Sequence, residues 1–198
     1  MSGLVLASAS AVRARVLEGA GVGFDIRPAH VDEEAVKDSL LAAGAGMRDV
    51  ADALAELKAL KVSSSQPDVF VLGADQVLAF EGELVSKCAS LEEARILLRR
   101  LRGRKHELIS GLVLAKAGAP VWRHVESAAL WMREFSDSFL DEYLAGEGEP
   151  LLKGVGCYRL EGRGAQLFER VEGDYFTVLG LPLVPLLGAL RQHGIVAT

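Results

Sequence analysis

The chain has 198 residues, 22 Lys and Arg against 27 Asp and Glu, a net charge of −5 and a hydrophobic share of 50%. This length predicts about one domain, and the composition excludes a disordered or collagen-like chain. The acidic balance argues against a sequence-independent grip on nucleic acid, which needs clustered Lys and Arg. Two cysteines, no signal-like N-terminus and no apolar run of the roughly 20 residues that span a bilayer predict a cytoplasmic protein without a membrane segment.

The first half of the chain interleaves short apolar runs with helical patterns. In chain order these predict a strand at 4–7, a helix that Ser10 caps and Gly19 ends, a helix at 47–62 and a strand at 69–72. No element is assigned to 33–46. Asp75 follows the second strand through Gly73 and Ala74, so an acid is expected at the carboxyl end of a buried strand, where open α/β sheets bind ligands.

The second half adds long strands and two well-marked helices. The predicted elements are a hairpin at 77–85 that turns at Glu81-Gly82, a helix from the capping box at Ser90 to Gly103, antiparallel strands at 107–116 and 121–133 joined at 118–120, a helix capped by Ser136, a strand at 166–171 and a closing helix at 182–190. Interleaved strands and helices imply a mixed sheet. We therefore expect one α/β domain with two lobes over residues 1–198.

One basic cluster departs from the acidic balance of the chain. It comprises Arg99, Arg100, Arg102, Arg104 and Lys105. Cations at the end of a helix complement its dipole, so one interpretation is a solvated helix end. The other interpretation is contact with nucleic acid, which predicts binding that falls steeply with salt.

Several strong catalytic signals are absent from the sequence: a GxxxxGK[ST] phosphate loop, a GxGxxG turn, a CxxC pair and a GxSxG elbow. The four histidines have no metal-ligand spacing, so zinc is not indicated. What remains is a set of acids with Lys and Arg near strand ends: Asp32, Glu33, Glu34, Asp75, Lys58, Lys87, Arg13 and Arg15.

Such a set suits a site for nucleotide phosphates. Carboxylates hold Mg²⁺ together with substrate phosphates, and neighbouring cations neutralise the remaining charge. Ser8 and Ser10 would add donors at a helix start, where anions are favoured. The alternative is that the acids are solvated loop residues and Ser10 is only a cap. Asp75 is the exception, because a buried carboxylate without a partner is costly and should be paired, metal-bound or catalytic.

The order of the motifs resembles that of the Maf family of nucleoside triphosphate pyrophosphatases over nearly the whole chain. The matching segments are LVLASAS with Arg13, VDE at 31–33, LAELKA at 54–59, GAD at 73–75, GE at 82–83 through Lys87, GRKH at 103–106 with Gly111, and GLPL at 180–183. The departures are Ala11 and Cys88 where proline is usual, Ser110 where threonine is usual, and a second arginine displaced to Arg15.

The resemblance implies an elongated mixed sheet with flanking helices, two lobes around a nucleotide cleft as in Maf- and ITPase-like folds, and a homodimer. It also implies hydrolysis of a nucleoside triphosphate to the monophosphate and pyrophosphate with Mg²⁺ or Mn²⁺. Carried over by position, Asp75 would accept the proton of the attacking water, Glu33 would help with the metal or the water, and both are expected metal ligands. The residues expected to bind the triphosphate are Ser8, Arg13, Lys58 and Lys87.

Three further positions bear on the choice of nucleotide. Gln76 and Glu161 are similar to the 7-methyl-GTP pyrophosphatase branch, whereas Val12 stands where that branch often has an aromatic residue. A carboxylate at Glu161 suits a cationic methylated guanine, since it accepts hydrogen bonds from N1–H and N2–H, and Gln76 could contact O6 or the sugar. The plainer interpretations are a surface residue for Glu161 and a neutral filler for Gln76.

Three other functions stay open. They are a pyrophosphatase of the dTTP and UTP type, a nucleotide-binding regulator of cell division or septum formation, and the nucleic-acid contact described above. An intact Asp75 with a full set of cations favours an enzyme, because a pure binding protein needs no such acid.

Overall fold

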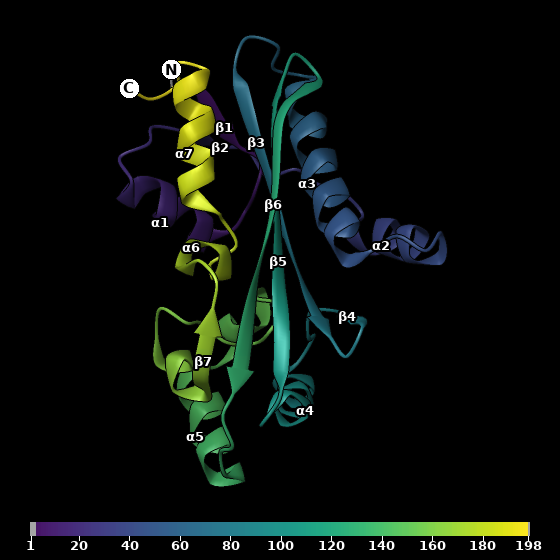
Figure 1. Ribbon diagram of the computed structural model, residues 1–198, viewed down its shortest axis with the longest axis vertical. Coiled ribbons are helices and arrows are strands. Elements are labelled where there is room, and N and C mark those ends of the chain that lie inside the picture. The colour runs from purple at the N-terminus through teal and green to yellow at the C-terminus, as the bar shows by residue number, and fades with distance from the viewer. Residues whose placement is uncertain (1–2, 198) are drawn as a thin grey trace. The chain divides into compact units, whose positions relative to one another are not determined.

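The computed structural model describes residues 3–197 (Figure 1). Its elements are β1 Leu4–Leu6, α1 Ala11–Gly19, β2 Asp25–Ile26, α2 Glu33–Ala42, α3 Met47–Ser63, β3 Phe70–Phe80, β4 Glu83–Val85, α4 Leu91–Leu101, β5 Lys105–Lys116, β6 Ala119–Met132, α5 Asp137–Glu147, η1 Glu149–Lys153, η2 Arg163–Leu167, β7 Phe168–Glu172, α6 Tyr175–Val178 and α7 Leu183–Gln192. None of the described helices is long and apolar enough to cross a membrane.

The described strands form one mixed sheet in the order β2-β1-β3-β5-β6-β7, with β4 paired to β3. Strand β1 is parallel to β2 and β3, whereas the β3–β4 and β6–β7 pairs are antiparallel. The expected α/β class with a mixed sheet and flanking helices is confirmed.

The chain divides into two compact units, each assembled from separate segments. Unit 1 comprises the residues up to Gln76, Ile109–Glu126 and the residues from Tyr175 onward, and unit 2 comprises Val77–Leu108 and Ser127–Asp174. The expectation of a single domain with two lobes around a nucleotide cleft stays a prediction.

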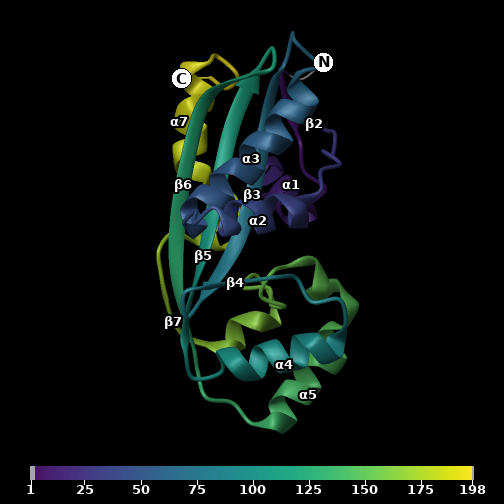
Figure 2. The same ribbon diagram turned by 90° about the vertical axis from the view of Figure 1, so that its right-hand side faces the viewer.

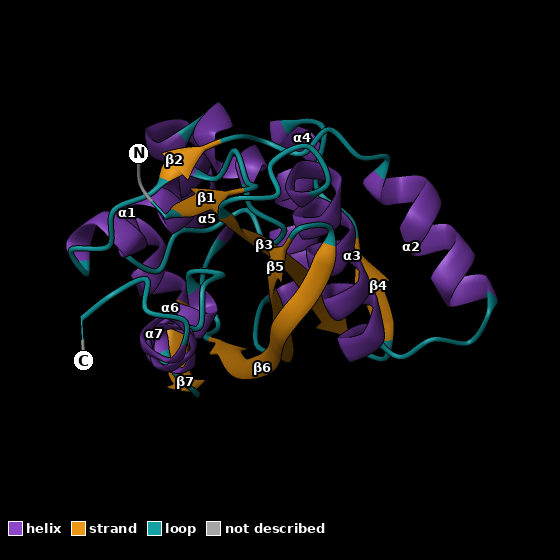
Figure 3. Ribbon diagram, turned by 90° about the horizontal axis from the view of Figure 1, so that it is seen from above, coloured by secondary structure: helices purple, strands orange, loops and turns teal. Residues whose placement is uncertain are grey.

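Unit 1 has helices on both faces of its strands, as Figures 1 and 3 show. Leu6 of β1 packs in one apolar cluster with Leu17 of α1 and Leu186 of α7. The preceding residue, Val5, packs with Val62 of α3. Successive strand residues point to opposite faces, so α1 and α7 cover one face of the strands in this unit and α3 covers the other.

Strand β3 is longer than its sequence predicts. The expected strand ends at 72 and places Asp75 at its carboxyl end, but β3 continues through Gly73 and Asp75 to Phe80. A Cβ at Gly73 would lie 2.1 Å from Ala55 O and 2.6 Å from Ala59 N of α3. The glycine therefore permits a close approach of α3 and does not end the strand, and the predicted position of Asp75 at the end of β3 is wrong.

The local signals for helix starts and for the hairpin are confirmed. Ser10, Ser90 and Ser136 each accept a hydrogen bond from the backbone N–H three residues later, at 3.4, 3.2 and 3.1 Å. Glu81 and Gly82 form the turn between β3 and β4, with φ of 52° and 86°. Two residues at positive φ are what a two-residue hairpin turn requires.

The structure differs from the expectation at α2, at the turn between β5 and β6 and at the start of β7. Helix α2 occupies the stretch left unassigned, and Asp32 caps it by accepting from Ala35 N at 3.1 Å. The turn between β5 and β6 lies at Ala117 and Gly118, with φ of 52° and 76°, so β6 begins directly after it. The 3-10 helix η2 extends to Leu167, and β7 therefore starts at 168 instead of 166.

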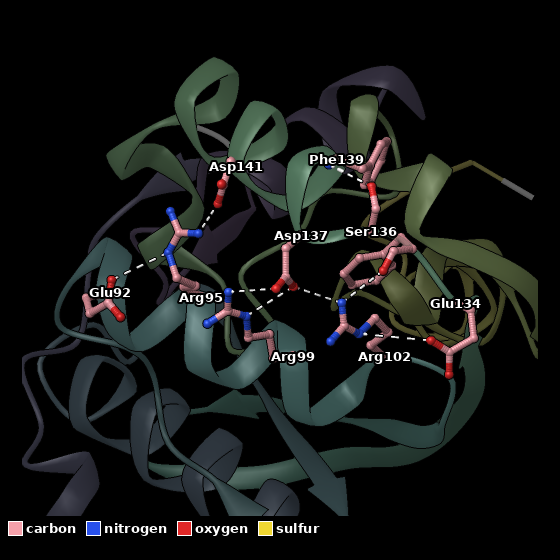
Figure 4. A network of polar contacts seen from close by, with 10 residues as sticks. Glu92, Arg95, Arg99, Arg102, Glu134, Ser136, Asp137, Phe139 and Asp141 are labelled. Atoms are coloured by element: carbon pink, nitrogen blue, oxygen red, sulfur yellow. Dashed lines mark hydrogen bonds and ion pairs between the residues drawn. The ribbon is translucent and has the colours of Figure 1, made fainter.

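In unit 2, α4 packs against α5 (Figure 2). Figure 4 shows Arg99 and Arg102 of α4 directed at Asp137, the first residue of α5. The other cations of the basic cluster also have acidic partners: Arg100 pairs with Glu83 at 3.9 Å, Arg104 with Glu81 at 2.6 Å and Lys105 with Glu107 at 2.8 Å. Arg99 and Arg100 lie in the last turn of α4, whereas Lys105 begins β5, so the helix-end interpretation describes only part of the cluster.

Candidate active site

The candidate site lies where β1 ends and β3 continues. In the parallel pairing of the two strands, Leu6 opposite Leu72 is the final pair, and Ala7 N donates to Leu72 O at 2.8 Å. The chain then leaves the sheet at Ser8 and enters α1. Ligands bind at the carboxyl ends of strands in open α/β sheets. Here it is β1 that ends, whereas β3 continues and contains Asp75 three residues beyond the last pair.

Arg13 of α1 occupies the place beside β3 that β1 vacates. Its Nη1 donates to Ala74 O at 2.8 Å and to Ser8 Oγ at 3.1 Å, and its Nε donates to Gly180 O at 2.9 Å. Burial lowers the pKa of the guanidinium, and the negative charges of Asp75 and Glu33 act in the opposite direction. These bonds orient Arg13 and do not use Nη2, the nitrogen that can bind an anion.

The hydroxyl of Ser8 is a donor toward the site. Ser8 Oγ accepts from Ser10 N at 3.3 Å and from Arg13 Nη1 at 3.1 Å. A hydroxyl has two acceptor lone pairs and one O–H. Since both lone pairs are engaged, the O–H is the part of Ser8 that remains to contact an anion.

Lys58 brings two carboxylates together on the α3 face. Its Nζ lies 2.5 Å from Asp75 Oδ1 and 2.7 Å from Glu33 Oε1. Lys58 and Asp75 are buried, whereas Glu33, the first residue of α2, is 28% exposed at its side chain. Asp75 is therefore paired, as a buried carboxylate requires.

Asp75 and Glu33 can bind a hard divalent cation if water and substrate supply its remaining ligands. The described residues contain no group of three or more His, Cys, Asp or Glu side chains that could hold a metal ion. Mg²⁺ commonly binds through one or two carboxylates and completes its shell with water and substrate phosphates. Asp75 and Glu33, which share Lys58, match that requirement.

Gln76 lies on the other face of β3, because neighbouring strand residues point to opposite sides. Its Nε2 lies 3.0 Å from Thr177 O, 3.1 Å from Val178 O and 3.1 Å from Ser110 Oγ. O6 of guanine accepts hydrogen bonds, and these contacts occupy the donating end of Gln76. Only the oxygen of the Gln76 side chain remains, and a group that contacts it must be a hydrogen-bond donor, such as a sugar hydroxyl.

The other predicted residues are placed as follows. Val12 is the half-buried second residue of α1, in unit 1. Lys87 is exposed after β4, and Glu161 is exposed in the turn before η2, both in unit 2. Their roles in binding the triphosphate and in specificity stay predictions, whereas unit 1 brings Ser8, Arg13, Glu33, Lys58 and Asp75 into one network.

Sequence reasoning assigned no role to three residues that contact this network. They are Ser110, Thr177 and Gly180, which hold Gln76 or Arg13. Ser110 and Thr177 are completely buried polar residues. Ser110 lies in the otherwise apolar stretch 108–115 of β5, and this was the available signal, since buried hydroxyls need hydrogen-bond partners.

The sequence of this chain is similar to those of known nucleotide enzymes. Residues 3–193 match the family model described as Maf-like protein. A nucleoside triphosphate pyrophosphatase from Granulibacter bethesdensis is 54% identical over 190 residues, which cover 96% of each chain. A 7-methyl-GTP pyrophosphatase from Rhizobium meliloti is 48% identical over 191 residues, also 96% of each. The solved dITP/XTP pyrophosphatase of Mycobacterium abscessus aligns with a TM-score of only 0.38 at 17% identity, over 67% of this chain and 74% of its own.

Proposed function

This chain belongs to the Maf-like protein family and is a nucleoside triphosphate pyrophosphatase, and we propose that Asp75 is the base that activates the attacking water. The observation that carries this proposal is the buried Asp75 carboxylate, 2.5 Å from Lys58 Nζ and within the electrostatic reach of Arg13. A carboxylate held in this position can act as a general base and accept the proton of the water.

In the proposed reaction, water attacks the α-phosphorus in line with the bond to the β-phosphate. The new bond joins the water oxygen to phosphorus, and the water gives a proton to Asp75. The bond between the α-phosphorus and the bridging oxygen breaks, and the pyrophosphate leaves with the electron pair. Catalysis of this kind depends on positioning and on stabilising negative charge.

The cations of the site are proposed to bind the triphosphate. Arg13 is held by three hydrogen bonds, so it is oriented before substrate binds. Ser8 contributes its O–H. Lys58 is shared between two carboxylates, and phosphate oxygens are further acceptors for its ammonium. Lys87 is proposed as the remaining phosphate ligand, on the resemblance alone.

We also propose that Mg²⁺ or Mn²⁺ binds at Asp75 and Glu33. When bound, such an ion would neutralise phosphate charge and help to orient the triphosphate. Lys58 already holds both carboxylates close together, and this supports a metal site at that position.

For the substrate, we propose 7-methyl-GTP. The Rhizobium meliloti relative that is named for this activity supports the choice, as do the resemblance of Gln76 and Glu161 to that branch. Glu161 is proposed to accept from N1–H and N2–H of the methylated base. The resemblance likewise supports a homodimer and a cytoplasmic enzyme, and size-exclusion chromatography with light scattering tests the first of these.

The experiment is a measurement of pyrophosphate release from 7-methyl-GTP, GTP, dTTP, UTP and CTP with each metal. We expect 7-methyl-GTP to be preferred, Asp75→Asn to lose activity and Glu161→Gln to change the preference among bases. Preference for dTTP or UTP would contradict the proposed substrate. No hydrolysis of any nucleotide would contradict the proposed reaction and favour a nucleotide-binding regulator.

A further inference from the structure

We infer that Ser110 is a positioning residue that fixes the carboxamide of Gln76, so that Gln76 Oε1 accepts a hydrogen bond from an N–H or O–H group of the nucleotide. The inference rests on the proposed function. On the α6 side of β3, the protein thus presents a hydrogen-bond acceptor to a donor group of the substrate.

Three acceptors surround the nitrogen of the Gln76 side chain. Two are the backbone carbonyls of Thr177 and Val178, at 3.0 and 3.1 Å, and the third is Ser110 Oγ, at 3.1 Å. Ser110 Oγ in turn donates to Thr177 O at 3.0 Å. Because that bond uses the hydroxyl hydrogen, Ser110 can only accept from Gln76.

This arrangement defines which end of the amide faces the protein. The two ends of a glutamine side chain are distinguished by their hydrogen-bond partners. A rotated amide would place Oε1 against the carbonyl oxygens of Thr177 and Val178, which cannot donate, and it could accept from Ser110 only if that hydroxyl gave up its bond to Thr177 O. The nitrogen must therefore face Ser110 and Thr177, and Oε1 must face away from them.

Gln76 is less buried than the residues that hold its side chain. Ser110 and Thr177 are completely buried, whereas Gln76 is half-buried. Within the described range 3–197, no residue donates a hydrogen bond to Gln76 Oε1. The amide is thus held at its nitrogen inside unit 1 and has its oxygen left for a donor on the nucleotide.

The segment 177–180, which contacts Gln76, also contacts Arg13, the arginine proposed to bind phosphate. Gly180 O accepts from Arg13 Nε at 2.9 Å, and Gly180 has a φ of 84°. A Cβ there would lie 3.4 Å from Arg13 Nη2 and 3.6 Å from Gln76 Cδ. Residues 177–180 therefore set the positions of Arg13 and Gln76 together, which ties the donor-reading oxygen to the phosphate site.

The ligand chemistry follows from an acceptor of fixed direction. The donors of a guanosine nucleotide are N1–H, the N2 amine and the ribose hydroxyls. A site that is built to pair with a donor discriminates strongly against an analogue that lacks it, because the buried acceptor loses its partner. Because Glu161 is proposed to accept from N1–H and N2–H, the group that Oε1 contacts is identified by the analogue whose KM penalty depends on Gln76 and Ser110.

The test compares kcat and KM for GTP with those for ITP, 1-methyl-GTP, 2′-deoxy-GTP and 3′-deoxy-GTP. ITP and 1-methyl-GTP remove donors of the base, and the two deoxynucleotides remove donors of the sugar. For the wild type, we expect KM to rise at least tenfold for the analogue that lacks the contacted donor. For Ser110→Ala, we expect that discrimination to shrink about fivefold through KM, with a much smaller change in kcat. Equal KM values for all five nucleotides with the wild type would overturn the inference.

Two comparisons distinguish positioning from general damage. Ser110→Thr retains the hydroxyl and should restore wild-type discrimination, and in a Gln76→Ala background Ser110→Ala should change KM no further. Ser64→Ala is the matched control, because Ser64 Oγ also donates to a backbone carbonyl, that of Leu60, but on the surface. An equal loss of kcat/KM for every nucleotide, or no loss for any, would overturn the inference.

A failure of the proposed reaction is distinguishable from a failure of this inference. If the wild type hydrolyses no nucleotide, calorimetric binding of the same five nucleotides to the wild type and Ser110→Ala gives the discrimination as a ratio of Kd values. Discrimination that depends on Ser110 would support the positioning role without the reaction, and discrimination that ignores Ser110→Ala would overturn it.

Discussion

The ammonium group of Lys58 lies 2.5 Å from the carboxylate of Asp75, and both side chains are buried. The same nitrogen contacts Glu33 at 2.7 Å. One cation from α3 thus compensates an acid from β3 and the first residue of α2. The carboxylate proposed as the base therefore has its closest counter-charge on another element, and the effect of removing that charge can be measured.

Replacement of Lys58 by methionine should destabilise the protein by about 3 kcal/mol, because it leaves the buried Asp75 without its closest counter-charge. The double variant Lys58→Met with Asp75→Asn should recover most of that loss. Urea denaturation at neutral pH measures both. As a control, Arg104→Met breaks an exposed pair with Glu81 and should cost less than about 1 kcal/mol. Equal losses for the two methionine variants would contradict the importance of burial.

Asp75→Asn should lower kcat by at least a hundredfold, because an amide cannot accept the proton of the attacking water. Its fold should persist, since Lys58 retains the contact with Glu33. Pyrophosphate release and nucleotide binding are measured on the same preparation. Normal binding together with turnover clearly above the uncatalysed rate would show that another group is the base.

The buried imidazole of His106 should make stability depend on pH. Its Nε2 lies 2.7 Å from Tyr158 Oη, and among the described residues its Nδ1 has no hydrogen-bond partner. Burial lowers the pKa of His106 from 6.5 to about 4. Between these values the unfolded chain binds a proton that the folded chain does not. Stability is therefore fully present above pH 6.5 and falls as the pH drops to 4.

The loss should approach about 3 kcal/mol, the equivalent of the pKa difference. Denaturation of the wild type and His106→Gln at pH 8, 6, 5 and 4 measures it. The wild type should lose more stability than the variant over this range. If the two curves run parallel, His106 is not the group responsible.

Short-range chemistry made much of the fold predictable. The serine caps at Ser10, Ser90 and Ser136 and the turn at Glu81-Gly82 depend on residues within three or four positions, and each formed as expected. Contacts between distant segments were not predictable in this way. Gly180 and Arg13 are 167 positions apart, and Ser110 and Gln76 are 34 apart. No local pattern specifies such pairs.

The length of β3 could not be predicted from local sequence either. Gly73 and Ala74 resemble the end of a strand when only the neighbouring sequence is considered, because glycine is unfavourable inside strands. The structure gives the glycine a different role, since α3 packs directly on its backbone. Helix α3, which lies 10 to 26 positions earlier in the chain, supplied that role, and the acid at position 75 lies inside the strand as a result.

Gly73→Ala tests this explanation. Its Cβ would lie 2.1 Å from Ala55 O and 2.6 Å from Ala59 N, so α3 must move away from β3 and take Lys58 from Asp75. We expect a loss of roughly 3 kcal/mol or more, of the size that severe overpacking causes, together with reduced pyrophosphate release. Gly188→Ala, in α7, is the matched control. Nothing lies within 4 Å of its Cβ, and alanine favours a helix, so stability should rise by about 0.5–1 kcal/mol. A Gly73→Ala variant as stable as the wild type would mean that α3 does not need the glycine for its close approach.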